Sequence, residues 1–205
     1  MFVKAIVDQI NPDIDHQCDM SAVSCEQDPN QILCRYSTNI DLYSFEATLA
    51  TGSSLARHIV NRMYRGEYYS LQIHDHAVFV QDWDVSIVEQ HDAIDNEMAV
   101  ISTYLKQAHG NLDKDGKANN VAEYAICNAS FEGFGRNRFL KHFKSAQPLV
   151  VSPIEGNSYL HPFWSSSFAF SRGHFILNVP YDPYLILIST DDEEISMALR
   201  AWTHG

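Results

Sequence analysis

Positive charge is missing from a long stretch of this sequence. Residues 66–105 contain no lysine or arginine, and the whole chain has 14 such residues against 26 aspartates and glutamates. The formal net charge of -12 at pH 7 repels a phosphate backbone, so direct nucleic-acid binding is disfavoured. A surface of one sign attracts partners of the other, so the acidic stretch predicts a basic protein partner. The expected partner-binding residues are Asp82, Asp84, Glu89, Asp92, Asp95 and Glu97.

Long apolar runs are also absent. No stretch approaches the length needed to cross a bilayer, so we expect neither a membrane span nor a membrane partner. The N-terminal segment Met1–Asp8 is too short, and too soon charged, for a signal peptide. These absences predict a cytoplasmic protein.

Closely spaced cysteine pairs are missing as well. The chain has Cys18, Cys25, Cys34 and Cys127, and none of these forms the C-x2-C pair common in structural zinc sites. Their spacings fit no compact disulfide framework either. In a reducing cytosol they are expected to be free thiols.

Familiar catalytic and nucleotide-binding motifs do not occur. No glycine-rich phosphate loop follows a predicted strand, which argues against a P-loop or a dinucleotide fold. No G-x-S-x-G elbow is present. We therefore predict no catalytic residue and no required cofactor, with calcium or a transition metal as alternatives.

The sequence does contain enough apolar material for a core. Hydrophobic residues make up 45% of its 205 residues, which predicts a single α+β domain over residues 1–205. The N-terminal two-thirds should be rich in helix, and the C-terminal third should be an antiparallel strand meander with a terminal helix. Strands are expected at 2–7, 32–36, 68–73, 77–81, 149–152, 164–171, 175–179 and 184–189. Helices are expected at 38–50, 53–65, 84–109 and 136–145, and from Thr190 onward.

Histidines beside acids suggest one alternative function. His74-Asp75-His76 and His91-Asp92 are similar to the His-Asp pairs of metal-dependent phosphohydrolases. In extended chain His74 and His76 face the same side, so the two histidines could act together. The alternative is a metal-dependent hydrolase that uses His74, His76, His91 and Asp92. The competing explanation is a set of histidines hydrogen-bonded to nearby acids.

The segment 111–123 suggests a second alternative. It places oxygen ligands at Asn111, Asp113 and Asp115, with Gly116 where a calcium-binding loop turns sharply and Glu123 as its closing acid. Glu123 stands one residue later than in an EF-hand, and two lysines lower the local negative charge. A calcium-binding structural protein is one interpretation, and a polar Asp-Gly turn is the other.

A sparser pattern links Arg35, the serines Ser165-Ser166-Ser167 and the acids Glu193-Glu194. Their order resembles the Arg, Ser, Glu order of ADP-ribosyltransferases, at three short points of the chain. In place of that family's paired acidic motif the chain has four consecutive acids, 191–194, which attraction to a helix N-terminus explains. A capping box between Thr190 and Glu193 supports this explanation.

Taken together, these patterns favour a non-enzymatic acidic protein-binding module of the inhibitor or immunity type. It would occlude a basic, possibly nucleic-acid-binding, protein through complementary charge. The hydrolase and the calcium-binding protein stay open as alternatives. The oligomeric state cannot be derived from these patterns.

Overall fold

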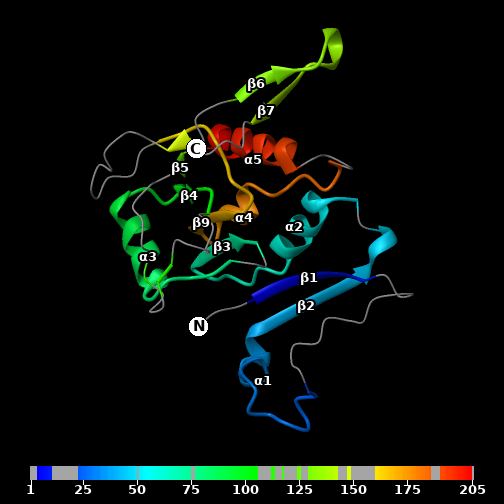
Figure 1. Cartoon of the computed structure of the whole chain (residues 1–205), viewed down its shortest axis with the longest axis vertical. Helices are drawn as coiled ribbons and strands as arrows, with labels where there is room; N and C mark the ends of the chain where they lie inside the picture. Colours follow the sequence, from blue (N-terminus) through cyan, green and yellow to red (C-terminus); the bar gives the residue numbers. More distant parts are fainter. Residues whose placement is uncertain are drawn as a thin grey trace. The chain divides into compact units, whose positions relative to one another are not determined.

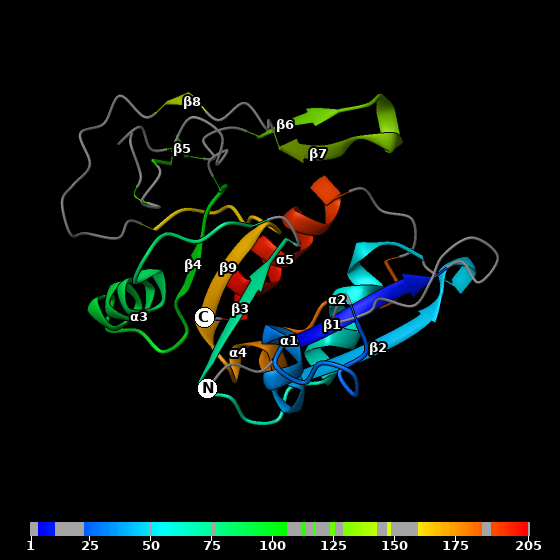
Figure 2. The same ribbon diagram turned by 60° about the horizontal axis from the view of Figure 1, so that its bottom comes forward.

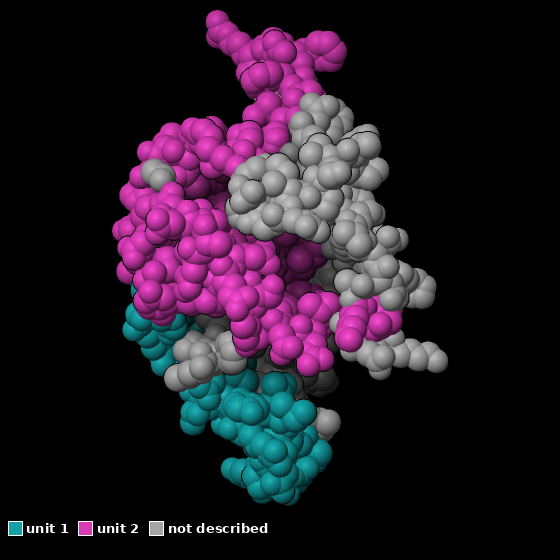
Figure 3. Space-filling model, turned by 90° about the vertical axis from the view of Figure 1, so that its left-hand side faces the viewer, with its two compact units in different colours: residues 1–67, 180–187 teal, residues 68–179, 188–205 magenta. Residues whose placement is uncertain are grey.

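The computed structural model describes residues 4–10, 23–49, 51–74, 77–105, 112–113, 117, 124–125, 129–142, 147–148, 160–185 and 190–204. The chain groups into two compact units, which Figure 3 distinguishes by colour. Unit 1 comprises residues 1–67 and 180–187, and unit 2 comprises 68–179 and 188–205. Both units therefore combine segments that are distant in sequence. That the whole chain forms one domain stays a prediction.

Unit 1 is built on two parallel strands. β1 (Lys4–Ile10) pairs with β2 (Ile40–Glu46), in register from Lys4 beside Ile40 to Ile10 beside Glu46 (Figure 1). α2 (Ser53–Arg62) lies against β1 and follows Gly52, whose φ of 119° favours glycine. Shorter helical turns are α1 (Ile32–Arg35) and the 3-10 helices Ser37–Asn39 and Ala47–Leu49.

Two predictions in unit 1 are wrong, and two are confirmed. The expected strand 32–36 is the helical turn α1, and the expected helix 38–50 contains β2. The spacing of Leu42, Phe45 and Leu49 fits a helix face, but backbone pairing with β1 determines the conformation. The expected strand near 2–7 and the helix from Ser53 are present as β1 and α2.

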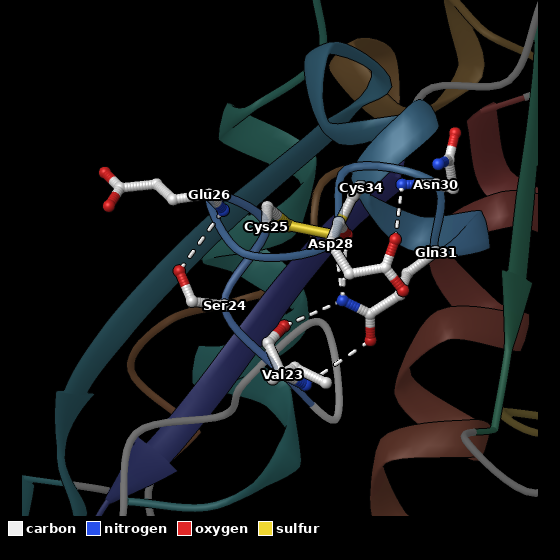
Figure 4. Close-up of a disulfide and its surroundings, with 8 residues drawn as sticks. All are labelled: Val23, Ser24, Cys25, Glu26, Asp28, Asn30, Gln31 and Cys34. Carbon is white, nitrogen blue, oxygen red and sulfur yellow. Dashed lines mark hydrogen bonds between the residues drawn. A yellow bond between two sulfur atoms is a disulfide. The ribbon is translucent and has the colours of Figure 1, made fainter.

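A disulfide closes the loop that precedes β2. Cys25 and Cys34, nine residues apart, are bonded to each other. Gln31 lies beside the bridge, and its Nε2 donates to the carbonyl oxygen of Val23 at 2.8 Å (Figure 4). The prediction of free thiols is therefore wrong for this pair, because the loop folds back and brings the two sulfur atoms together. The other cysteines, Cys18 and Cys127, lie outside the described residues.

Unit 2 contains a three-stranded antiparallel sheet. Its strands are β3 (Tyr69–Ile73), β9 (Phe168–Arg172) and β4 (Val100–Ser102), with β9 in the centre. β3 confirms the expected strand 68–73, and β9 covers the second half of the expected strand 164–171.

Helices cover both faces of this sheet. α3 (Trp83–Ala93) lies beside the sheet (Figure 2), and its Ile87 packs with Phe168 and Phe170 of β9 on one face. Side chains alternate along a strand, so the buried Ala169 and Ser171 face the opposite side. Figures 1 and 2 draw α5 (Thr190–His204) on that opposite side. The central strand is consequently buried on both faces.

The long helix expected over 84–109 ends much earlier. α3 stops at Ala93, and Asp95 then adopts a φ of 54°, which a right-handed helix cannot include. The Oδ1 of Asn96 accepts the backbone N–H of Met98 at 2.9 Å and closes a turn. Ile101, which continued the apolar spacing of the expected helix, lies in β4 and packs against the core.

The segment after the expected calcium loop forms two further strand pairs. β6 (Ala129–Glu132) pairs with β7 (Phe139–His142), and β5 (Tyr124–Ala125) with β8 (Gln147–Pro148), each antiparallel. The helix expected over 136–145 is wrong for its described part. Gly135–Asn137 is a 3-10 turn, and pairing with β6 holds 139–142 extended.

The C-terminal third has less strand than expected. Residues 175–178 form the helical turn α4 (Phe175–Asn178) instead of a strand, so no hairpin forms across Arg172 and Gly173. Residues 77–80 have no regular structure, and 149–152 and 186–189 lie outside the described residues. α5 begins at Thr190, as predicted.

The predicted α+β class is confirmed, because helices pack with a small antiparallel sheet. Among the described residues, no helix has the length and apolar character that crossing a membrane requires.

Candidate functional site

Three chain segments of unit 2 meet at one edge of the sheet. β3 and β4 are both antiparallel to β9, so their C-terminal ends lie beside the start of β9. Ile73 pairs with Phe168, and Ser102 pairs with Ala169. The loop 165–167, which leads into β9, therefore meets the segments that follow β3 and β4. Loops held in place by a sheet in this way are common locations for functional residues.

Glu194, early in α5, is the centre of a buried hydrogen-bond network at this edge. Its side chain accepts the backbone N–H and the hydroxyl of Ser166 at Oε1, each at 2.8 Å. Its Oε2 accepts the hydroxyl of Tyr104 at 2.7 Å. Glu194 is only 2% exposed, so these three donors replace water around a charged group. They hold the carboxylate in one orientation between the two loops.

Serines extend this network into the sheet. The backbone N–H of Ser165 donates to Ser102 Oγ at 2.7 Å, and that hydroxyl donates to the carbonyl oxygen of Phe168 at 3.1 Å. The hydroxyls of Ser165 and Ser167 are 2.7 Å apart. Gln72 of β3 donates from Nε2 to the carbonyl oxygen of Ser166 at 2.9 Å. We call Gln72, Ser102, Tyr104, Ser165, Ser166, Ser167, Glu193 and Glu194 the serine–glutamate cluster.

Glu193 supplies a second buried carboxyl group next to Glu194. It is 1% exposed, and acidic side chains are rarely buried to this extent in a fold without a specific reason. Buried carboxyl groups can accept a proton or stabilise developing positive charge, and that of Glu194 lies against a hydroxyl and a phenol. Burial of ionisable groups at one sheet edge is typical of functional sites.

His161 lies against the same cluster and is held in one tautomer. Its Nδ1 accepts the backbone N–H of Phe163 at 3.3 Å, so that nitrogen carries no proton. Its Nε2 is 3.2 Å from the carbonyl oxygen of Ser102, which can only accept, so Nε2 carries the proton. Burial lowers the pKa of His161, and the bond to Ser102 partly opposes that change. The ring is therefore neutral near pH 7.

The predicted partner-binding acids lie on α3 or beside it, away from these contacts. Asp92 accepts the hydroxyl of Tyr69 at 2.9 Å, and Glu97 pairs with Arg172 at 3.4 Å. Asp82 directly precedes α3, and Asp84 lies in its first turn. Glu89 is exposed on α3, and Asp95 lies in the turn that follows the helix. Binding of a basic partner at these residues stays a prediction.

The histidines proposed as hydrolase ligands do not come together among the described residues. His91 is 3% exposed, its Nε2 lies 3.1 Å from the carbonyl oxygen of Ala99, and its ring packs on Phe170. It is a core histidine whose hydrogen-bond partner is a backbone carbonyl group, not the acid that the competing explanation expected. His74 directly follows β3 at the edge that holds the cluster, and His76 lies outside the described residues.

Of the expected calcium ligands, Asp113 alone is described. Its Oδ1 accepts the backbone N–H of Lys117 at 2.8 Å, and its own N–H donates to the carbonyl oxygen of Lys117 at 2.9 Å. Such bonds are typical of a polar turn. Asn111, Asp115 and Glu123 lie outside the described residues, so the calcium site stays a prediction.

Sequence reasoning missed most of the serine–glutamate cluster. The serines and Glu193-Glu194 entered only through the ADP-ribosyltransferase resemblance, and Arg35 of that pattern lies in unit 1. Ser102 and Tyr104 were placed inside the long expected helix. One signal was available: a polar triplet, Ser165 to Ser167, between the aromatic pair Phe163-Trp164 and a strand.

The sequence was compared with known proteins, solved structures and family models. No curated protein and no solved structure matches the sequence. The family model described as Glycosyltransferase (GlcNAc) matches residues 4–205. A family of enzymes that covers nearly the whole chain overturns the prediction of a non-enzymatic inhibitor or immunity-type module, and it replaces the hydrolase and calcium-protein alternatives. The chain belongs to the glycosyltransferase (GlcNAc) family.

Proposed function

We propose that this protein transfers an N-acetylglucosaminyl group from an activated sugar donor to an acceptor hydroxyl, with the serine–glutamate cluster at the reaction centre. Family membership over residues 4–205 supports the reaction type. One observation carries the location: Glu194, buried early in α5 beside the equally buried Glu193, is bonded to Ser166 of the loop before β9 and to Tyr104 after β4.

The chemistry of glycosyl transfer explains why acids are needed. The bond between the anomeric carbon and the leaving group breaks, a bond from that carbon to the acceptor oxygen forms, and the acceptor hydroxyl loses its proton. Positive charge develops on the sugar ring on the way, as in glycoside hydrolysis, where carboxylates stabilise it or accept the proton. Glu193 and Glu194 provide such groups in a water-poor environment, where their charge acts more strongly.

We assign different roles to the two glutamates. Glu194 is a positioning residue, because its carboxylate already accepts three hydrogen bonds and orders the loop 165–167. Glu193, the second buried carboxyl group of α5, is the candidate for the group that accepts the acceptor proton. His161 is held neutral with its Nε2 proton toward Ser102, so it supports the loop and is not the base.

The leaving group of an activated sugar is commonly a phosphate, and its negative charge needs a counter-charge. Residues 66–105, which contribute β3, α3 and β4, contain no lysine or arginine to provide it. A transition metal bound through His74 would supply positive charge there, because His74 follows β3 at the same sheet edge, whereas His76, the other expected ligand, lies outside the described residues. Activity that survives dialysis against a chelator would remove the metal from this proposal and leave the reaction intact.

The test is donor turnover by the full chain. Purified protein is incubated with a nucleoside diphosphate N-acetylglucosamine labelled in the sugar, and release of free sugar and of nucleoside diphosphate is followed. We expect slow hydrolysis of this donor and a weaker reaction with the matching glucose donor, which lacks the acetamido group. Absence of both turnover and binding for the N-acetylglucosamine donor, across the common nucleotides, would reject the proposal.

A further inference from the structure

The β6–β7 hairpin of unit 2 has the reverse charge pattern of the acidic stretch. Residues 133–154 contain no aspartate or glutamate, and 136–144 hold four of the chain's 14 lysines and arginines. The hairpin is a separate two-stranded sheet, and β7 contacts α5. In Figure 1 the hairpin extends beyond α5, and its turn is the end farther from that helix. A local basic segment in a chain with net charge -12 is therefore presented at a hairpin turn.

Two phenylalanines are exposed at this turn. Phe134 is 94% exposed and Phe131 is 63% exposed. Gly133 has a φ of 90° and Gly135 a φ of 60°, and side-chain-bearing residues rarely adopt either value. The two glycines thus allow the backbone to turn on both sides of Phe134, and its ring is left exposed.

Two arginines stand next to these rings. Arg136 and Arg138 are exposed, and the guanidinium carbon of Arg138 lies 5.2 Å from the ring centre of Phe131. This contact limits the orientations of Arg138 and leaves its donors free to meet a carboxylate. We call Phe131, Phe134, Arg136 and Arg138 the hairpin tip.

We propose that the hairpin tip binds an acidic segment of another polypeptide. The two arginines match its carboxylates, and Phe134 contacts an apolar side chain between them. Aromatic residues and arginine are the types enriched at protein interfaces and at their strongest contacts. Nucleic acid and anionic membranes fit less well, because both need an extended basic surface, whereas the tip presents two arginines beside two aromatic rings. This proposal does not depend on the transfer reaction.

Binding is tested with a short fluorescein-labelled peptide of alternating glutamate and leucine, by fluorescence anisotropy at low salt. The same peptide with lysine in place of glutamate, phosphatidylserine vesicles and a single-stranded oligonucleotide are compared in parallel. We expect the glutamate peptide to bind, with affinity that falls as salt rises. Binding of the vesicles or the oligonucleotide alone, or equal binding of the lysine peptide, would overturn the proposal.

Variants locate the contact. Phe134→Ser, and the double change Arg136→Glu with Arg138→Glu, should each weaken peptide binding by about tenfold or more. The matched control is Arg35→Glu with Arg62→Glu, which changes the net charge equally at exposed arginines of unit 1. All of these side chains are exposed, so thermal unfolding should be unchanged. Equal weakening in the control, or full binding by both tip variants, would show that the tip is not the binding site.

Discussion

Two groups of acidic residues in this chain differ in almost every physical respect. The acids of residues 82–97 are numerous and mostly exposed, and those with side-chain partners bond a tyrosine and an arginine at the surface. Glu193 and Glu194 are a single pair and are 1% and 2% exposed, and Glu194 is bonded to Ser166 and Tyr104. The first group is the more prominent one in the sequence, because a high density of acidic residues can be counted there directly. The second group forms the candidate site because buried polar groups interact more strongly with their neighbours than exposed ones do, and burial cannot be seen in the sequence.

The largest effect expected from this difference is at Glu194. Glu194→Ala removes the acceptor that Glu194 gives to the buried Ser166 and the half-buried Tyr104, so the free energy of unfolding should fall by about 3 kcal/mol or more. Glu194→Gln retains one oxygen for Ser166, so it should cost less than the alanine change. Donor turnover should fall by about 100-fold or more in both. Urea unfolding and the donor assay measure the two effects.

Glu193→Gln separates the roles of the two glutamates. It should reduce turnover as strongly as Glu194→Gln while donor binding, measured by calorimetry, is retained. If Glu193→Gln had full turnover, Glu193 would not be the base, although the position of the site would stand on the Glu194 variants.

The next effect concerns the phenol that completes the network. Tyr104→Phe removes a hydrogen bond to a buried carboxylate and should lower the free energy of unfolding by about 2 kcal/mol. Tyr184→Phe is the matched control, because Tyr184 is 86% exposed and the change there should cost less than about 0.5 kcal/mol. Equal costs at both positions would mean that burial of the cluster does not strengthen its bonds.

A smaller effect should come from pH. Burial lowers the pKa of His161 below its usual 6.5, so the unfolded chain binds a proton that the folded chain rejects. The contribution of His161 to stability is therefore full above pH 6.5 and is lost as pH falls toward the lowered pKa. We expect His161→Gln to lose less stability than the unmodified protein between about pH 7 and about pH 5. Urea unfolding across that range gives the comparison, and identical pH profiles would contradict it.

Local signals in the sequence were enough for the elements that local chemistry determines. The starts of α2 at Ser53 and α5 at Thr190 follow from polar residues before an apolar stripe, and β3 follows from its β-favouring residues. The failures occurred where distant pairing decides. β2 depends on β1, more than thirty residues earlier, and β7 depends on β6 across a glycine turn. A helical spacing of apolar residues was present in both cases and was overridden by strand pairing.

The candidate site was harder to predict for the same reason. Its parts come from β3, the segment after β4, the loop before β9 and the start of α5, which are far apart in sequence. Tyr104 and Glu194 are 90 positions apart, so no helical or strand periodicity in the sequence predicts that they meet. The same holds for Ser102. The four acids 191–194 were explained by attraction to a helix N-terminus, and this explanation is valid for an exposed acid. It does not account for Glu193 and Glu194, because both are buried.

The smallest effects should occur at the exposed acids of residues 82–97. Substitutions there test whether exposed acids contribute less to stability and turnover than the buried pair does. Glu89 is exposed on α3 three residues before Asp92, so Glu89→Lys replaces a like-charged pair with an opposite one and should change stability by less than about 0.5 kcal/mol. Glu97→Gln removes the pairing with Arg172, but Glu97 is 72% exposed, so the loss should stay below about 1 kcal/mol. Neither change should alter donor turnover, because both residues lie on elements outside the serine–glutamate cluster. If Glu89→Lys lowered turnover as much as Glu194→Gln, charge at the surface of α3 would contribute to the reaction, and burial would no longer distinguish the functional acids from the others.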